Sequence, residues 1–154
     1  MNYTLYLCPE NSYSLDMPIF IVFAFALPFL LWPLEMMIQS LGIGYIFLIE
    51  ELAKAILLFY AFKNIKKGFI TYAIILGSAF FLTETIFYFF NIFGSGSTNA
   101  LIMRVMYTLP MHILTSLFIA VGIMRGSKAG ITIGLFLATI THLLFNLLIK
   151  RLGL

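Results

Sequence analysis

Charged residues and cysteine are both scarce in this sequence, and each shortage excludes particular classes of protein. Only 10% of the 154 residues are charged, whereas soluble domains carry about 25%. A water-soluble globule, an intrinsically disordered chain and a basic nucleic-acid-binding protein are therefore excluded. Cys8 is the single cysteine, so the chain forms neither an intramolecular disulfide nor a cysteine-based metal cluster.

Apolar residues dominate the sequence instead. They make up 62% of the chain, 17% of it is aromatic, and the mean hydropathy is +1.07. This composition is typical of an integral membrane protein whose surface contacts the lipid bilayer. The net charge of +3 arises from 9 Lys and Arg against only 6 Asp and Glu, so it predicts no nucleic-acid partner.

Five apolar segments are long enough to cross a membrane as helices, which takes about 20 residues each. They comprise residues 17–38, 43–62, 68–93, 100–124 and 129–149. Unpaired backbone polar groups are not tolerated against lipid, and the alternating pattern of a barrel is absent, so each segment is predicted to be a helix. The sequence predicts an all-α, polytopic bundle in one membrane domain of residues 1–154, with residues 1–16 as an N-terminal tail.

Basic residues predict the orientation of the bundle. The connections after the second and fourth segments carry Lys63, Lys66, Lys67, Arg125 and Lys128. Because successive helices alternate in direction, these connections share one side of the membrane with the N-terminus. The positive-inside tendency places that side in the cytoplasm, with the protein in the cell membrane.

Four glycines recur at intervals of four residues across the last connection. They are Gly122, Gly126, Gly130 and Gly134. Small residues at this spacing let helices pack closely or dimerise. We interpret Gly122 and Gly126 as part of the turn, and Gly130 and Gly134 as a helix contact.

Polar side chains at membrane depth are the most informative feature, since each ionisable one costs about 2.5–3.5 kcal/mol even on a lenient scale. The segments contain Glu50, Glu51, Lys54, Glu84, Arg104, His112, His142 and Asn146, including both histidines of the protein. Pro110 precedes His112 by two residues and either opens the helix beside it or only kinks it. Such a set of residues indicates a functional site.

Spacing and depth predict that these residues meet. Glu50 and Glu51 both share a helical face with Lys54, so Lys54 is expected to form a structural ion pair with one of them. Counted from the side of the third connection, the polar positions lie about 7–12 residues inside, a depth of roughly 10–18 Å. We therefore expect one polar layer around a water-accessible cavity that opens on the extracytoplasmic side.

Four motifs follow one another in successive segments over about residues 43–149. They are Glu50-Glu51-Leu52-Ala53-Lys54 (EExxK), Phe80-Phe81-Leu82-Thr83-Glu84 (FxxxE), His112, and His142-Leu143-Leu144-Phe145-Asn146 (HxxxN). This order resembles the PrsW family of intramembrane proteases, which is grouped with the CPBP proteins and type II CAAX prenyl endopeptidases. The resemblance implies a four-helix catalytic core and a glutamic peptidase without a cofactor. Its implied substrate is a membrane-anchored protein or peptide, such as an anti-sigma factor.

The resemblance also implies roles for individual residues. Glu50 would be the general base that activates water, Glu84 its partner, and His142 and Asn146 the oxyanion side. Glu51 and His112 are implied to belong to the same catalytic set. The CAAX group has histidine where this chain has Glu84, so a prenylated peptide is not the expected substrate.

Other interpretations of the same residues stay open. Glu50, Glu84, His112 and His142 are also suitable ligands for zinc or iron. A non-catalytic scaffold or immunity-type protein would use the polar layer for helix association. The sequence lacks the GxSxG motif, which argues against a serine protease, and the HExxH motif, which excludes the usual zinc-helix protease. The absence of an internal repeat argues against a transporter.

Overall fold

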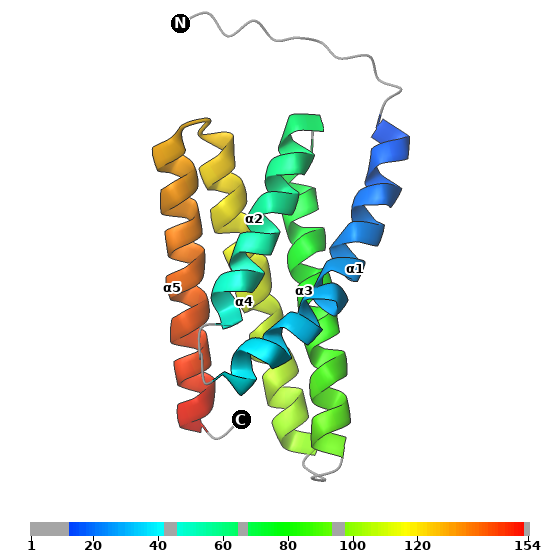
Figure 1. The fold of residues 1–154 in the computed structure, drawn as a ribbon, viewed down its shortest axis with the longest axis vertical. Coiled ribbons are helices and arrows are strands. Elements are labelled where there is room, and N and C mark those ends of the chain that lie inside the picture. The colour runs from blue at the N-terminus through cyan, green and yellow to red at the C-terminus, as the bar shows by residue number, and fades with distance from the viewer. Residues whose placement is uncertain (1–12, 42–45, 65–67, 94–97, 153–154) are drawn as a thin grey trace, which may run out of the picture.

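Five α-helices make up the part of the chain that the structure, a computed structural model, describes, namely residues 13–41, 46–64, 68–93 and 98–152. They are α1 (Tyr13–Ser40), α2 (Ile46–Asn64), α3 (Phe69–Phe93), α4 (Thr98–Met124) and α5 (Lys128–Leu152). Successive helices run in opposite directions and lie side by side as one bundle (Figure 1). The predicted all-α fold is confirmed, and each helix coincides with one predicted segment over its described residues; residues 43–45 of the second segment are not described. Cys8, Lys66, Lys67 and most of the predicted tail lie outside the described residues.

Four of the helices are long and apolar enough to cross a membrane. The spans within α1, α3, α4 and α5 are Met17–Ile38, Phe69–Phe90, Leu101–Met124 and Lys128–Leu152. α2 is not among them, because Glu50, Glu51, Lys54 and Lys63 interrupt its 19 residues. The prediction of a fifth span at α2 stays a prediction.

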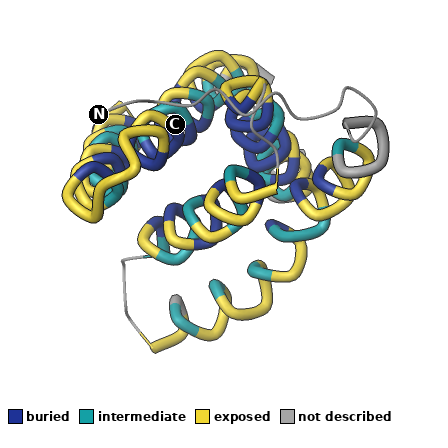
Figure 2. Tube along the Cα trace, turned by 90° about the horizontal axis from the view of Figure 1, so that it is seen from above, coloured by how far each residue is buried: buried dark blue, intermediate teal, exposed yellow. Residues whose placement is uncertain are grey.

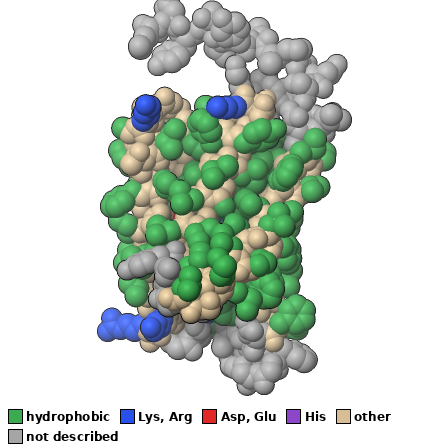
Figure 3. Space-filling view, viewed as in Figure 1, with side chains coloured by type: hydrophobic (Ala, Val, Ile, Leu, Met, Phe, Trp, Pro, Cys, Tyr) green, Lys and Arg blue, Asp and Glu red, His purple; other side chains and the backbone are tan. Residues whose placement is uncertain are grey.

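The outer surface of the bundle is apolar. Leu30, Ile56 and Phe90 are each more than 70% exposed. Figure 3 shows hydrophobic side chains over the middle of one face, with Lys and Arg near its two ends. Apolar side chains covering the middle with cations at the ends are typical of a lipid-facing surface.

The interior is formed mainly where α3 and α4 meet the other helices. α4 packs against α2, α3 and α5, and α1 packs against α2 and α3. Figure 2 shows the buried residues along the inner sides of the helices. Leu58, Leu76, Ala79, Ile119 and Ala138 are among the buried hydrophobic residues. This packing fixes the positions from which polar side chains reach the interior.

Glycines set the close approach of α4 and α5. A Cβ on Gly122 would lie 2.6 Å from the carbonyl oxygen of Gly130, and one on Gly134 would lie 2.5 Å from that of Phe118. The predicted helix contact at Gly130 and Gly134 is confirmed. The assignment of Gly122 to the turn was wrong, because it lies inside α4 against both glycines of α5. Gly126 alone makes the turn, with a φ of +65°.

Substituting Gly134 by alanine tests this contact. We expect the variant to lose about 1–3 kcal/mol of unfolding free energy, because the added methyl group meets backbone atoms that cannot rotate away. Denaturant unfolding in micelles measures the change. Thr132→Ala, on the exposed face of α5, should leave stability nearly unaltered. Equal stability of both variants would show that the helices do not touch here.

Prolines shape the path of α1. Pro18, Pro28 and Pro33 all lie inside this helix, and proline removes a backbone hydrogen bond and bends a helix. In Figure 1, α1 descends obliquely and its last turns cross below the start of α2. α4 likewise continues through its proline, Pro110, to Met124, so this proline does not interrupt the helix beside His112.

Candidate active site

A cavity of about 460 Å³ lies at the end of the bundle where α2 and α4 begin and α1, α3 and α5 finish. All five helices contribute to it. Its polar lining consists of Glu35, Glu50, Glu84, Arg104, His142, Asn146 and Lys150, and its aromatic lining of Trp32, Phe47, Phe87 and Tyr88. This volume is within the usual range of binding sites for small molecules or short peptide segments.

Lys54 occupies the centre of a polar cluster behind the cavity wall. Its side chain is fully buried on α2. The Nζ atom lies 2.7 Å from Glu51 Oε1, 3.0 Å from His112 Nδ1 and 3.1 Å from Thr115 Oγ1. Glu51 is reached because it lies one helical turn away on the same face. Lys54 therefore pairs with Glu51 rather than with Glu50.

Both histidines connect this cluster to the cavity. His112 Nε2 lies 2.6 Å from Glu84 Oε2, and His142 Nδ1 lies 2.7 Å from Glu51 Oε1. The second nitrogen of His142, Nε2, faces Glu50 Oε2 at 3.9 Å. The contacts form a continuous path from Glu84 through His112, Lys54 and Glu51 to His142. The buried cluster thus joins Glu84 and His142, which both line the cavity.

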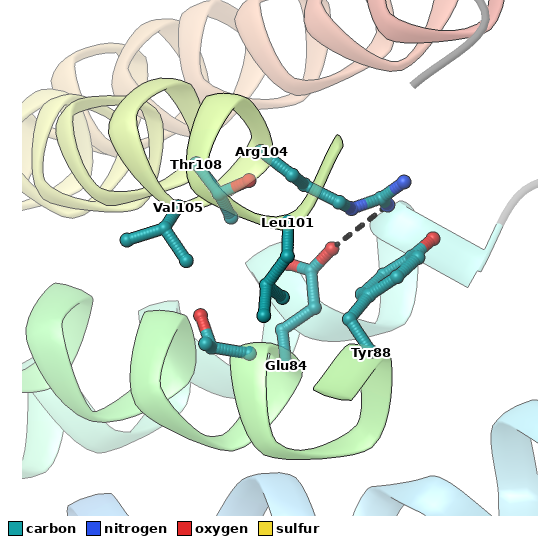
Figure 4. A pocket seen from close by; sticks show the side chains of 7 residues that line it. Glu84, Tyr88, Leu101, Arg104, Val105 and Thr108 are labelled. Atoms are coloured by element: carbon teal, nitrogen blue, oxygen red, sulfur yellow. Dashed lines mark hydrogen bonds and ion pairs between the residues drawn. The ribbon is translucent and has the colours of Figure 1, made fainter. Parts of the chain in front are cut away.

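Arg104 forms the other contact of Glu84, as Figure 4 shows from close by. Its Nη2 atom lies 3.4 Å from Glu84 Oε1, and its Cζ atom lies 3.1 Å from the centre of the Tyr88 ring. A hollow of about 10 Å³ between α3 and α4 adjoins this pair, which is room for about one water molecule. Arg104 thus places a positive charge, held by an aromatic ring, against the carboxylate of Glu84.

The structure brings the predicted residues together in two layers. Glu50, Glu84, His142 and Asn146 line the cavity. Glu51 and His112 are fully buried and reach it only through hydrogen bonds to His142 and Glu84. The single water-accessible layer expected from the sequence is therefore divided into a cavity wall and a buried support. Glu84 contacts His112 and Arg104, and its implied partnership with Glu50 stays a prediction.

Sequence reasoning overlooked Glu35 and Trp32, which α1 contributes to the cavity. Glu35 is the only charged residue among residues 17–38. An ionisable side chain within a membrane span is a functional candidate by default, so the signal was present. Trp32 had no comparable signal, because one aromatic residue in an apolar helix is ordinary.

The site also bears on the metal-ligand interpretation. Catalytic zinc takes three protein ligands and one water molecule. Among the described residues, no three of His, Cys, Asp and Glu are grouped so that they could hold a metal ion. His112 uses both ring nitrogens, and Glu84 both oxygens, in contacts with other side chains. Of the four residues in the metal-ligand interpretation, Glu50 and His142 Nε2 then remain with atoms to offer, and two donors do not make a catalytic metal site.

A comparison with protein families identifies the chain. A family model described as PrsW family intramembrane metalloprotease matches residues 19–154. No curated protein and no solved structure matches the chain. The matched region includes every residue of the cavity and of the buried cluster. The chain is therefore a multi-pass membrane protein that belongs to the PrsW family of intramembrane proteases.

Proposed function

We propose that this protein is an endopeptidase that hydrolyses a peptide bond of a membrane-anchored protein within the cavity. The observation that carries this proposal is the pair formed by Glu50 and His142. Their Oε2 and Nε2 atoms face each other at 3.9 Å in a cavity lined by all five helices. This separation exceeds a direct hydrogen bond, and one water molecule can contact both atoms across it.

The groups around this gap are suited to peptide hydrolysis. Glu50 and His142 both offer acceptors for a proton of the attacking water. Asn146 lines the same cavity one helical turn beyond His142, and its amide nitrogen can donate to the oxygen of the carbonyl under attack. A donor of this kind contributes about 3–4 kcal/mol in a known hydrolase.

The lining of the cavity favours a peptide substrate that arrives from the membrane. Trp32, Phe47, Phe87 and Tyr88 provide an apolar wall that can receive side chains of an unwound membrane segment. Unwinding is required, because helical hydrogen bonds otherwise shield the carbonyl that is attacked. A membrane-anchored anti-sigma factor is the substrate class that the resemblance implies.

The family description names a metalloprotease, yet the donor set of this chain does not fit a metal ion. His112 and Glu84 are engaged with each other and with Lys54 and Arg104. Activation of water is therefore assigned to the chain's own side chains, Glu50 and His142.

Cleavage assays test the proposed function. Purified protein would be incubated with a panel of single-span substrates and compared with Glu50→Gln and His142→Gln. We expect both variants to cleave at least about 100-fold more slowly, the usual contribution of a proton-transfer group. Thr132→Ala, which is remote from the cavity, should cleave like the wild type.

The outcomes of this assay, without and with a metal chelator, decide between the proposed function and its alternatives. Equal cleavage by all four proteins, or no cleavage of any substrate, would contradict the proposal, and the second outcome would favour a scaffold. Cleavage that persists in a chelator supports chemistry without a metal. Activity that is lost in the chelator and restored by zinc would favour the metal-dependent alternative.

The cleavage position tests the orientation. The residues that line the cavity belong to helix ends that lie opposite the last turn of α2 and the turn between α4 and α5 (Figure 1). Lys63, Arg125 and Lys128 lie at those positions, so the positive-inside tendency predicts an extracytoplasmic site. Mass spectrometry of the products should locate the cut near the outer boundary of the substrate's span. Cuts at the cytoplasmic end would contradict this orientation.

A further inference from the structure

The contacts of Lys54 determine which nitrogen of His112 carries a proton. An ammonium group has three N–H donors and no acceptor. Its three neighbours are Glu51 Oε1, His112 Nδ1 and Thr115 Oγ1, so each of them accepts one hydrogen bond. Nδ1 of His112 is consequently unprotonated, and Nε2 carries the proton that is donated to Glu84 Oε2.

The contacts of Glu51 determine the opposite arrangement at His142. A carboxylate that pairs with an ammonium group only accepts hydrogen bonds. His142 Nδ1 lies 2.7 Å from Glu51 Oε1 and therefore carries the proton. Nε2 of the neutral ring is then left with a lone pair, and this is the atom that faces Glu50 across the cavity.

We infer that Lys54 and Glu51 hold the two histidines in opposite neutral tautomers, and that His142 Nε2 is consequently the atom that takes the proton from the attacking water. This inference rests on the proposed function and specifies its proton acceptor. The same lone pair cannot donate a hydrogen bond. Of the two residues to which the resemblance gives the oxyanion role, Asn146 alone then fills it, because its amide carries donors.

The resulting reaction balances without any other reagent. The water molecule between Glu50 and His142 loses a proton to His142 Nε2, while its oxygen forms a bond to the carbonyl carbon of the substrate. The π electron pair of the C=O bond moves onto the carbonyl oxygen, where the Asn146 amide can donate to it, and it re-forms the C=O bond when the C–N bond breaks. Glu50 Oε2 accepts the second O–H of the water and holds it in place. The C–N bond then breaks, and the proton on His142 Nε2 passes to the departing amine, which restores the neutral ring.

Glu51 is a positioning residue in this scheme, because it acts through His142. Its carboxylate fixes the orientation and tautomer of the ring and stabilises the imidazolium that forms. Replacing the equivalent aspartate of a serine protease by asparagine lowers kcat by about 10⁴-fold through the wrong tautomer. Both Glu51 and His142 have almost no exposed surface, so bulk water does not compete for their hydrogen bond.

Nitrogen-15 NMR of the full-length protein measures the tautomers directly. The chain contains only two histidines, so labelling histidine gives two pairs of ring-nitrogen signals, which a His112→Gln variant assigns. We expect proton-bearing Nε2 and unprotonated Nδ1 in His112, and the reverse in His142. Finding the same tautomer in both rings, or a proton on Nε2 of His142, would overturn the inference.

A matched pair of substitutions tests the positioning role. Glu51→Gln should lower kcat by about 10²- to 10⁴-fold with little change in KM, and its spectrum should show that His142 has lost the uniform Nδ1–H form. Glu35→Gln also replaces a carboxylate of the site. Among the described residues, the hydrogen bonds and ion pairs of the two histidines do not include Glu35, so the tautomer of His142 should be unaltered. A Glu51→Gln variant with normal kcat would overturn the inference.

The two measurements separate the failure of this inference from the failure of the proposed function. Substrate cleavage by a wild-type protein whose histidines share one tautomer would overturn the inference alone. Opposite tautomers in a protein that cleaves no substrate would overturn the proposed function, and with it the role of His142 as proton acceptor. If Glu51→Gln does not fold, the wild-type spectrum still decides the tautomers.

Discussion

Replacing Lys54 by methionine is expected to lower the free energy of unfolding by about 3–5 kcal/mol and to abolish cleavage. The substitution keeps much of the volume and removes the ammonium group. Glu51 would then be a buried carboxylate without its cation, and His112 Nδ1 and Thr115 Oγ1 would lose their donor. Denaturant unfolding in micelles measures the stability, and the substrate assay measures the activity.

Two further variants separate the effect of the Lys54 charge on stability from its effect on activity. The double substitution Lys54→Met with Glu51→Gln removes both charges, so we expect it to recover most of the lost stability but not the activity. Lys54→Arg keeps the positive charge and should retain part of the activity. Normal expression and activity of Lys54→Met would show that the buried ion pair supports neither the fold nor the site.

The helices could be predicted from the sequence because lipid permits few alternatives. A long apolar segment in a membrane must satisfy its own backbone hydrogen bonds, so it becomes a helix. This constraint located all five helices and the turn at Gly126. It also predicted a span at α2, which stays a prediction because Glu50, Glu51, Lys54 and Lys63 reduce the hydropathy of this helix.

The packing of the helices against one another could not be predicted from the sequence pattern. Gly122 looked like part of a turn, and only the packing of α4 against α5 shows that it is a contact residue. Likewise, Glu35 lines the cavity because the last turns of α1 cross below the start of α2 (Figure 1). Such a crossing depends on how the three prolines bend α1 and on which helices α1 contacts. The hydrophobic periodicity of the sequence predicts neither of these.

Within the site, residue identity was easier to predict than partnership. Glu50 and Glu51 lie four and three residues before Lys54, and both spacings permit an ion pair. The choice of Glu51 depends on the direction in which α4 presents His112 and Thr115 toward Lys54. Glu84 illustrates the same limit, because its contacts with His112 and Arg104 arise only from the packing of α3 against α4.

Substituting Gly77 is expected to disrupt the fold and the site together. This glycine of α3 lies against the backbone of α4 beside His112, a member of the buried polar cluster. A Cβ here would lie 2.6 Å from the carbonyl oxygen of His112 and 2.8 Å from Cα of Ile113. Because these are backbone atoms, they cannot rotate aside, and α4 must move away from α3.

The loss should increase with the size of the side chain. We expect Gly77→Ala to cost about 1–3 kcal/mol of unfolding free energy and Gly77→Val to cost more. Displacement of α4 also lengthens the contacts of His112 with Lys54 and Glu84, which measure 3.0 and 2.6 Å. An error of about 1 Å in a catalytic arrangement can reduce the rate about 100-fold, so cleavage should fall even in variants that fold.

Thr71→Val is the matched control, because it places valine on the exposed side of the same helix. It should unfold and cleave like the wild type. Unfolding in micelles, substrate cleavage and the histidine spectrum would be recorded for all three variants. If Gly77→Val cleaves normally and leaves the tautomer of His112 unchanged, then α3 and α4 do not hold this histidine in place, and the buried support of the cavity must be assembled in another way.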